Sequence, residues 1–411
     1  MTPQSTSPAD PGAARGGIIR LAFLVTHPTQ YQTPLLRLIA AEPGIELKVF
    51  FCSDYSTREH WDPGFGRAIE WDISLLDGYE HEFLPAFGGR ERMSFWRPYS
   101  HGLAKRLRAG NFDTLWIHGY ARWFHWVAMF SARRLGIKVL LSDEATPIST
   151  PRGPLKRLAK TLFFGALKQA CNGFLAIGSL NREYYLERGV AEDRIFHFPY
   201  AVDNARFQAA AATAAERREA LRAELGLEAG RPIILFVAKL IPRKRAGDLL
   251  EAYSRLSVDP AFGAPYLVFV GDGELRTTLE RHAAAQGLDS VRFLGFKNQS
   301  ELPGLYDLAD VFVLPSVREP WGLVVNEAMN AGRAVIVSDQ IGCAPDLVRN
   351  GENGFIFEAG DIDALAPALH GVIADAGRCR AMGRKSLEII DAWGYGEEIA
   401  GLKRALEFVA R

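Results

Sequence analysis

Residues 317–339 read V-R-E-P-W-G-L-V-V-N-E-A-M-N-A-G-R-A-V-I-V-S-D, and this stretch organises the rest of the chain. Pro320 disfavours helix in the residues before it, and Gly322 loosens the turn that follows. The apolar residues from Leu323 to Ala331 then predict a helix that begins at this turn. The N-terminus of such a helix offers free N–H groups and the positive end of the helix dipole, which suit a phosphate group.

Two glutamates border this helix start. Glu319 lies in the loop, and Glu327 lies about one turn inside the helix, roughly 6 Å along its axis at ~1.5 Å per residue. Carboxylates beside a bound anion would repel it unless they face other groups. Sugar hydroxyls are suitable partners because one carboxylate accepts two hydrogen bonds from a vicinal diol, and a nucleotide sugar carries diols on both sides of its diphosphate. Taken alone, each glutamate would more simply be a solvated surface residue.

A longer pattern surrounds these glutamates. Glu-x7-Glu contains Pro-x-Gly and is followed by Ala-x-x-Ala-Gly and by a strand of the buried type, residues 334–338. The pattern resembles the signature of the family 4 retaining glycosyltransferases (glycosyl transferases group 1), which have the GT-B fold. The resemblance is close over residues 195–360 and looser before them. It implies an α/β fold in which two Rossmann-like domains face each other across a cleft, with a C-terminal helix that crosses back to the first domain.

Length and pattern agree with two domains, because 411 residues are too many for one ordinary core. Residues 1–17 contain no apolar segment, so we expect a disordered tail there and not a signal peptide. The expected parts that follow are an acceptor-binding Rossmann-like domain (18–205), a linker (206–231), a nucleotide-sugar-binding Rossmann-like domain (232–390) and a helix that packs on the first domain (391–411).

Composition excludes some classes of protein. The 48 basic and 48 acidic residues balance, which argues against nucleic acid as the main partner. No apolar run reaches the roughly 18 residues of a transmembrane helix, so such a helix is excluded. The four cysteines are widely separated and form no C-x-x-C pair. This spacing predicts reduced, buried thiols in a cytoplasmic protein.

The first half alternates short apolar runs with segments of helical period. The runs are β-branched or aromatic and almost continuous, as in strands buried on both faces of a parallel sheet. Ligands of such sheets bind beyond the carboxyl ends of the strands, so the residues after each strand are candidates for function. The expected strands are residues 18–26, 45–52, 114–118, 139–142 and 174–177.

Three strand ends supply candidate residues for the acceptor or the donor sugar. His27 and Gln30 follow the first strand in a His-Pro-x-Gln-Tyr loop, which resembles a subgroup of the family; many other members carry a Gly-Gly loop here. His118 ends the third strand beside a glycine, and in the resembling family a histidine at this point faces the donor sugar. Tyr120 and Asp143 are weaker acceptor candidates. Each of these side chains alone would more simply serve a structural or solvated role.

Two regions of the first half have alternative interpretations. Six of the eight tryptophans fall in the first third of the chain, where they either stack on acceptor sugars or fill a core under a long loop. In residues 152–172, lysines and arginines alternate with leucines and phenylalanines at helical spacing. Such a helix contacts an anionic membrane surface, here the inner face of the membrane, or covers the sheet with its apolar face. The two roles are compatible.

The second domain begins with a buried-type strand that is followed by Lys239 and Lys244. Cations at this point would face the cleft, and a diphosphate needs fixed positive charge, most of all when it becomes the leaving group. The family has Arg at the position of Lys239 and Lys at that of Lys244; solvated surface lysines are the alternative. By resemblance, Gly271 and Gly273 approach the donor with their backbone, and Phe296 meets the base.

The resemblance implies a hexosyltransferase reaction. A sugar moves with retention from a UDP- or GDP-linked donor to an acceptor hydroxyl of a sugar, a lipid-linked molecule or a glycoconjugate, as in polysaccharide or glycolipid synthesis. Glu327 would hold the ribose hydroxyls and Glu319 the donor sugar, while His118 serves catalysis. Lys239, Lys244 and the helix-start N–H groups would bind the diphosphate. Those N–H groups belong to Gly322, Leu323, Val324 and Val325.

Two features of the chemistry follow from what the sequence lacks. No Asp-x-Asp stands where a metal would bridge the phosphates, so no metal or other cofactor is expected beside the nucleotide sugar. No carboxylate is obviously placed as a nucleophile, and the resemblance to the family then implies same-face attack guided by the leaving phosphate. Two alternatives stay open: a nucleotide-sugar epimerase or hydrolase of the same fold, which needs no acceptor, and a non-catalytic nucleotide-sugar-binding protein.

Overall fold

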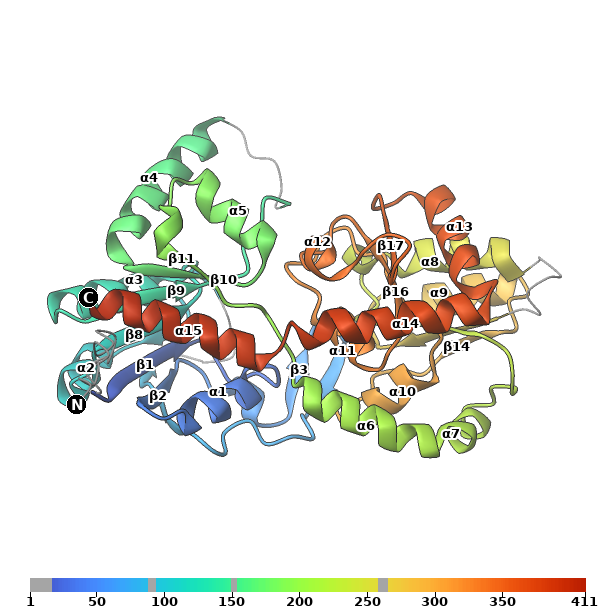
Figure 1. The fold of residues 1–411 in the computed structure, drawn as a ribbon, viewed down its shortest axis with the longest axis horizontal. Helices are drawn as coiled ribbons and strands as arrows, with labels where there is room; N and C mark the ends of the chain where they lie inside the picture. Colours follow the sequence, from blue (N-terminus) through green and yellow to red (C-terminus); the bar gives the residue numbers. More distant parts are fainter. Residues whose placement is uncertain (1–16, 88–93, 149–153, 258–264) are drawn as a thin grey trace, which may run out of the picture.

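The computed structural model describes residues 17–87, 94–148, 154–257 and 265–411, which form two α/β domains (Figure 1). Seven parallel strands make the first sheet, in the order β11-β10-β9-β8-β1-β2-β5. Its central strands are buried on both faces, as their continuous apolar runs predict. The strands are β1 (Ile19–Val25), β2 (Ile45–Phe51), β5 (Glu80–Phe83), β8 (Thr114–His118), β9 (Lys138–Ser142), β10 (Gly173–Ala176) and β11 (Ile195–His197).

The second sheet has six parallel strands in the order β14-β13-β12-β15-β16-β17. Two parallel sheets of this kind confirm the expected α/β fold with two Rossmann-like domains. The strands are β12 (Ile233–Val237), β13 (Tyr266–Val270), β14 (Val291–Phe293), β15 (Val311–Leu314), β16 (Ala334–Ser338) and β17 (Gly354–Phe357).

Helices cover both faces of the first sheet, and one of them comes from the far end of the chain. α15 (Tyr395–Ala410) crosses from the second domain to the first (Figure 1), as expected for the C-terminal helix. It buries Leu402, Ala405 and Leu406 in one core with residues of β1, β2, β9 and β10. The other helices of this domain are α1 (Gln32–Ala41), α2 (Leu103–Gly110), α3 (Trp123–Arg134), α4 (Pro154–Ala170) and α5 (Ser179–Glu187), with 3-10 turns at Tyr55–Thr57 and Glu192–Arg194.

The region expected as a linker contains two helices, α6 (Asn204–Glu216) and α7 (Arg218–Glu224). Both pack against α10 (Leu302–Leu308) of the second domain. Arg218 Nε donates to Asp307 Oδ2 at 2.8 Å and fixes α7 there. The remaining helices of this domain are α8 (Ala246–Ser257), α9 (Arg276–Ala285), α11 (Leu323–Asn330), α12 (Ala344–Leu347), α13 (Ile362–Ile373) and α14 (Ala376–Asp391), with a 3-10 turn at Pro242–Lys244.

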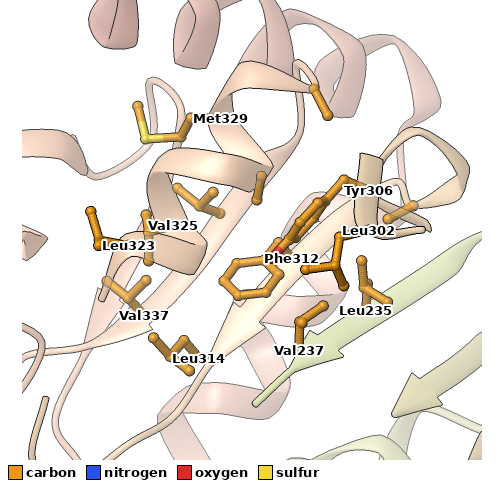
Figure 2. Packing of buried hydrophobic residues seen from close by; sticks show 14 of the residues in the cluster. Leu235, Val237, Leu302, Tyr306, Phe312, Leu314, Leu323, Val325, Met329 and Val337 are labelled. Atoms are coloured by element: carbon orange, nitrogen blue, oxygen red, sulfur yellow. The ribbon is translucent and has the colours of Figure 1, made fainter. Parts of the chain in front are cut away.

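Figure 2 shows the core beneath the start of α11. Leu323, Val325 and Met329 extend from this helix into the core, and Tyr306 of α10 packs beside Phe312 of β15. The ring centroids of Tyr306 and Phe312 are 5.9 Å apart. Full burial of side chains of this size contributes about 1.5–3 kcal/mol each, so the core fixes α10 and α11 relative to each other.

A small antiparallel hairpin projects from the first domain. It consists of β3 (His60–Asp62) and β4 (Arg67–Ile69), with Trp61 opposite Ala68. Figure 1 shows β3 near the middle of the molecule, where the two domains meet. A second short pair, β6 (Ala86–Phe87) and β7 (Tyr99–Ser100), lies elsewhere in the first domain.

Two predictions from composition can be compared with the structure. All four cysteines are buried and free, which confirms the predicted reduced thiols. Among the helices of the described ranges, none is both long and apolar enough to cross a bilayer. The expected tail at residues 1–17 lies outside the described residues except for its last residue.

Candidate functional site

A cavity of about 430 Å³ lies between the two domains. Loops that follow β12, β13, β14 and β15 line it, so it stands at the carboxyl ends of the second sheet, where parallel sheets bind ligands. The predicted residues that line it are Gln30, Lys239, Lys244, Gly271, Phe296, Glu319, Gly322, Leu323 and Val324. Most of the residues predicted to bind the donor thus lie around one cavity.

The start of α11 depends on Gly322, the residue before the first helical one. Gly322 has φ +102°, and a Cβ there would lie 2.9 Å from Ile341 Cγ2, so both conformation and space require glycine. Leu323 and Val324 follow it at the cavity wall. Val325 is a correction: it is fully buried, and its N–H donates to Gly322 O at 2.8 Å, so this amide serves the helix and is not an open donor.

Glu327 lies behind the cavity wall and is fully buried. The hydroxyl of Tyr306 donates to its Oε2 at 2.7 Å, and the hydroxyl of Tyr31, from the first domain, hydrogen-bonds the same carboxyl group. Burial raises the pKa of Glu327 to about 7, although both tyrosines act against this rise. Its Oε1 has no hydrogen-bond partner among the described residues. An unpartnered buried oxygen is costly unless something binds it.

Lys244 and Glu319 form an ion pair at the cavity, where the sequence led us to expect two separate ligand contacts. Lys244 is almost fully buried; burial lowers its pKa, and the charge of Glu319 opposes this effect. Arg243 approaches the same carboxylate at 3.5 Å from a more exposed position. The backbone of Glu319 is also held, because its N–H donates to Gln340 O and its carbonyl accepts from Gly342, each at 3.0 Å.

Lys239 contacts the first domain through the β3–β4 hairpin. Its Nζ donates to both carboxylate oxygens of Asp62 at 2.8 Å and lies 4.6 Å from the centroid of the Phe65 ring. Burial alone would raise the pKa of Asp62, but the hydrogen bond and the charge of Lys239 outweigh it and lower that pKa. The cation expected to bind a diphosphate is therefore paired with an aspartate.

The glycine loop after β13 packs against the loop after β12. A Cβ on Gly271 would lie 2.0 Å from Ala238 O, and one on Gly273 would lie 2.5 Å from Leu240 O. Only glycine allows these loops to approach so closely. Gly271 lines the cavity, whereas Gly273 is not among the residues that line it.

Phe296, expected at the nucleobase, belongs to an aromatic group made by both domains. Its ring centroid is 5.0 Å from that of Phe65 and 6.3 Å from that of Trp71. Its N–H donates to Asp272 Oδ2 at 3.0 Å, which fixes the loop after β14. Flat rings in this arrangement offer a surface on which a nucleobase can stack.

The two histidine candidates of the first domain lie outside the cavity lining. His118 Nδ1 is 3.0 Å from Ser142 Oγ; burial lowers the pKa of His118, and Glu144, which lines the cavity, acts against this shift. Burial also lowers the pKa of His27 to about 4, helped by the charges of Arg122, His60 and His118. Both imidazoles are therefore neutral at pH 7.

The other acceptor candidates differ in their surroundings. Gln30 lines the cavity. Tyr120 is half-buried, and its hydroxyl pairs with that of Tyr184 at 3.1 Å. Asp143 is a correction: it is buried and accepts from Tyr185 Oη at 2.7 Å and from Ala145 N at 2.6 Å, so its carboxyl group stabilises the domain interior in place of the expected acceptor contact.

The structure adds residues that were not among the candidates. From the first domain, Tyr31, Asp62, Phe65, Trp71, Glu144 and Tyr200 line the cavity. Tyr31 stands in the His-Pro-x-Gln-Tyr loop, and Asp62, Phe65 and Trp71 fall in the irregular region rich in tryptophan. The Asp-Pro-Gly turn at 62–64 was the available signal for a hairpin. In the described part of the chain, no three His, Cys, Asp or Glu side chains are arranged to hold a metal ion.

Comparison with known proteins finds a family match that covers most of the second domain. Residues 217–388 match the family model described as Glycosyl transferases group 1. Over 206 residues the chain is 34% identical to the GDP-mannose-dependent alpha-(1-6)-phosphatidylinositol monomannoside mannosyltransferase of Mycobacterium tuberculosis. This alignment covers 48% of the chain and 51% of the relative, so the chain spans about half the length of the curated relatives it matches.

Similar solved structures extend over both domains. The sucrose-phosphate synthase of Thermosynechococcus elongatus has a TM-score of 0.70 at 21% identity, covering 96% of this chain and 100% of the other. Anabaena HepE in complex with UDP has a TM-score of 0.71 at 17% identity, covering 95% and 100%. At such identities the likeness concerns the fold alone. The chain therefore has the GT-B fold, and its residues 217–388 carry the sequence pattern of the glycosyl transferases group 1 family.

Proposed function

We propose that this protein is a retaining glycosyltransferase that transfers a sugar from a nucleotide diphosphate sugar to an acceptor hydroxyl. The observation that carries the proposal is the interdomain cavity, where Lys239, Lys244 and the start of α11 meet, with the unpartnered carboxyl oxygen of Glu327 buried behind the cavity wall. These groups match a diphosphate and a ribose. The match of residues 217–388 to Glycosyl transferases group 1 supports the same reaction class.

In this proposal the donor lies along the loops of the second domain. The base stacks at Phe296, Glu327 accepts hydrogen bonds from the ribose, and Glu319 accepts from the donor sugar. Lys239, Lys244 and the amides at the start of α11 bind the diphosphate and stabilise the charge that it gathers as it leaves. These groups compensate the negative charge of the diphosphate without a metal ion.

The acceptor approaches from the first domain, where Gln30 and Glu144 line the cavity. Its hydroxyl attacks the anomeric carbon on the face from which the diphosphate departs, and the leaving phosphate takes the hydroxyl proton. The bond from the anomeric carbon to the diphosphate breaks as the new glycosidic bond forms, so configuration is retained. His118 lies behind this wall, with its Nδ1 3.0 Å from Ser142 Oγ, and serves catalysis from this position.

The reaction can be tested with a panel of nucleotide sugars. UDP-, GDP- and ADP-linked sugars are screened by thermal shift at equal concentration, because a donor that binds more tightly stabilises the fold more. The expected result is one preferred base, with transfer to a sugar or lipid-linked acceptor. Product analysis with and without acceptor separates the alternatives, since an epimerase or hydrolase converts the donor alone and a binding protein leaves it intact. Either outcome would contradict the proposal.

We also propose that the first domain contacts an anionic membrane surface on its α3–α4 side. The exposed apolar side chains there are Trp96, Trp123, Phe130 and Leu162, of which Leu162 is 70% exposed. The guanidinium of Arg134 lies 5.3 Å from the Phe130 ring centroid. Aromatic and basic groups together suit the headgroup region of a bilayer. Of the basic segment 152–172, residues 152 and 153 and the side chains of 154–160 lie outside the described residues.

A vesicle sedimentation assay tests this contact. The protein should sediment with vesicles of phosphatidylcholine and phosphatidylglycerol more than with phosphatidylcholine alone, because the anionic lipid attracts the basic face. Leu162→Glu should reduce binding several-fold. Leu38→Glu, at an exposed leucine of α1, is the matched control and should leave binding unchanged. Equal binding of all three proteins would exclude this surface.

A further inference from the structure

Asp62 holds Lys239 as an anionic ligand would. Its two oxygens contact one ammonium group, and the pair is part-buried, with 31% of the lysine and 13% of the aspartate side chain exposed. Asp62 Oδ1 also accepts the N–H groups of Gly64 and Phe65 at 2.8 and 3.1 Å, which orients the carboxylate toward the second domain. Screening by solvent is weak in such a position, so the pair is stronger than a surface ion pair.

Tyr31 of the first domain occupies a second polar position of the same site. Its hydroxyl hydrogen-bonds the carboxyl group of Glu327, as a ribose hydroxyl would in the proposed complex. Its carbonyl oxygen accepts from Tyr395 Oη at 3.0 Å, which anchors the loop to the crossing helix α15. Asp62 thus stands where the diphosphate would bind, and the Tyr31 hydroxyl stands where a ribose hydroxyl would bind.

Further contacts hold the hairpin region against the second domain. Arg67 approaches Asp272 at 3.7 Å, and its guanidinium lies 5.4 Å from the Phe296 ring centroid. Asp72 Oδ2 accepts the N–H of Ser300 at 3.1 Å, and Asn298 donates to Glu70 O at 2.7 Å. These loops follow β13 and β14, and the donor site includes them.

We propose that Asp62 is an affinity-determining residue of the donor site, because it neutralises Lys239 in the absence of donor and must release it when a diphosphate binds. Close pairing of one ammonium group with both anions is opposed, because it would bring the carboxylate and the diphosphate to a distance at which they repel each other. A ligand displaces Asp62 only if it brings more negative charge than one carboxylate. The site therefore favours a diphosphate over a neutral sugar or a singly charged group. This inference rests on the proposed function.

Calorimetry on the full chain tests the competition. The probe is whichever of UDP, GDP and ADP binds wild type most tightly, and the proteins are wild type, Asp62→Asn, Lys239→Met and the double variant. Asparagine keeps an oxygen for the Gly64 and Phe65 amides, so the hairpin is retained. Asp62→Asn should lower Kd about five- to tenfold, the size expected for one part-buried ion pair. The same change should have a clearly smaller effect in the Lys239→Met background, where it relieves only the direct repulsion between Asp62 and the diphosphate.

Asp72→Asn is the matched control, because it weakens another contact between the domains without touching Lys239; its Kd should stay within about twofold of wild type. If Lys239→Met weakens binding but Asp62→Asn does not tighten it, Asp62 does not compete with the diphosphate for Lys239, and the proposed function stands. Tightening of the same size in the Lys239→Met background, or tightening that Asp72→Asn reproduces, also contradicts this competition. If Lys239→Met leaves Kd unchanged, or no probe binds wild type, the proposed location of the donor site is contradicted. Asp62→Ser replaces Asp62→Asn if the latter does not fold.

Discussion

Replacing Lys244 by methionine should lower kcat/KM for sugar transfer about 10²–10³-fold, the effect of removing one preorganised charge from a transition state. Lys244 is buried at the cavity beside the start of α11, so its charge is close to the proposed leaving group and little screened. Methionine keeps the length of the side chain and loses only the ammonium group. Steady-state kinetics with the preferred donor measure the effect.

Two further variants separate this effect from a loss of folding. Lys244→Met leaves the part-buried Glu319 without its main partner, which should destabilise the protein by less than the roughly 3–5 kcal/mol expected for a fully buried pair. Adding Glu319→Gln removes that charge, so the double variant should regain stability without regaining activity. Arg243→Met, at the neighbouring and more exposed cation, should change kcat/KM by less than about threefold. Near-normal turnover of Lys244→Met would show that the diphosphate binds elsewhere.

Glu327→Gln should weaken nucleoside diphosphate binding about 10- to 100-fold, because hydrogen bonds to a charged group are worth about 1.5–3 kcal/mol. Glutamine fills the same space and still accepts the Tyr306 hydroxyl, so the free energy of unfolding should change little. Glu398→Gln is the matched control. Glu398 is also a fully buried glutamate with an unpartnered oxygen, but it lies on the crossing helix α15 and not on α11, whose start lines the cavity. Equal weakening in both variants would contradict the role of Glu327.

The pKa of Glu327 gives the same prediction a pH dependence. With a pKa of about 7, the carboxyl group is about nine-tenths ionised at pH 8 and about one-tenth ionised at pH 6. A ribose diol binds the ionised form best, so affinity is present above pH 7 and lost as pH falls through it. Between pH 8 and pH 6, wild type should lose about tenfold more affinity than Glu327→Gln. Parallel pH profiles for the two proteins would show that ionised Glu327 does not bind the donor.

Local features were well predicted because they depend on neighbouring residues. Pro320 and Gly322 set the start of α11, which begins at Leu323 as expected. The continuous apolar runs predicted five strands of the first sheet and, in the second, β12 and β16, but not β5, which lies in the irregular region. The spacing of Lys239 and Lys244 after β12 placed both at the cavity. Each of these signals lies within about ten residues, so no tertiary contact was needed to interpret it.

Contacts between the domains could not be predicted in the same way. Asp62 and Lys239 are 177 positions apart, and they meet only because the hairpin projects across the domain boundary. The pairing of Tyr31 with Glu327 has the same origin. Asp143 shows the converse. Its position at a strand end predicted an accessible carboxylate, but Tyr185 and Asn181 cover it and hydrogen-bond it. Burial of Val325 likewise follows from the core in Figure 2, which the loop sequence does not reveal.

The most direct test of the central claim, that a nucleotide diphosphate sugar binds between the domains through Lys239 and Glu327, is calorimetric titration of the preferred nucleoside diphosphate into the Lys239→Met/Glu327→Gln variant. The two residues bind different parts of the ligand, so their effects should add. The expected result is a Kd at least about 100-fold higher than that of wild type, in a free protein that remains folded. A Kd within about threefold of wild type would contradict it.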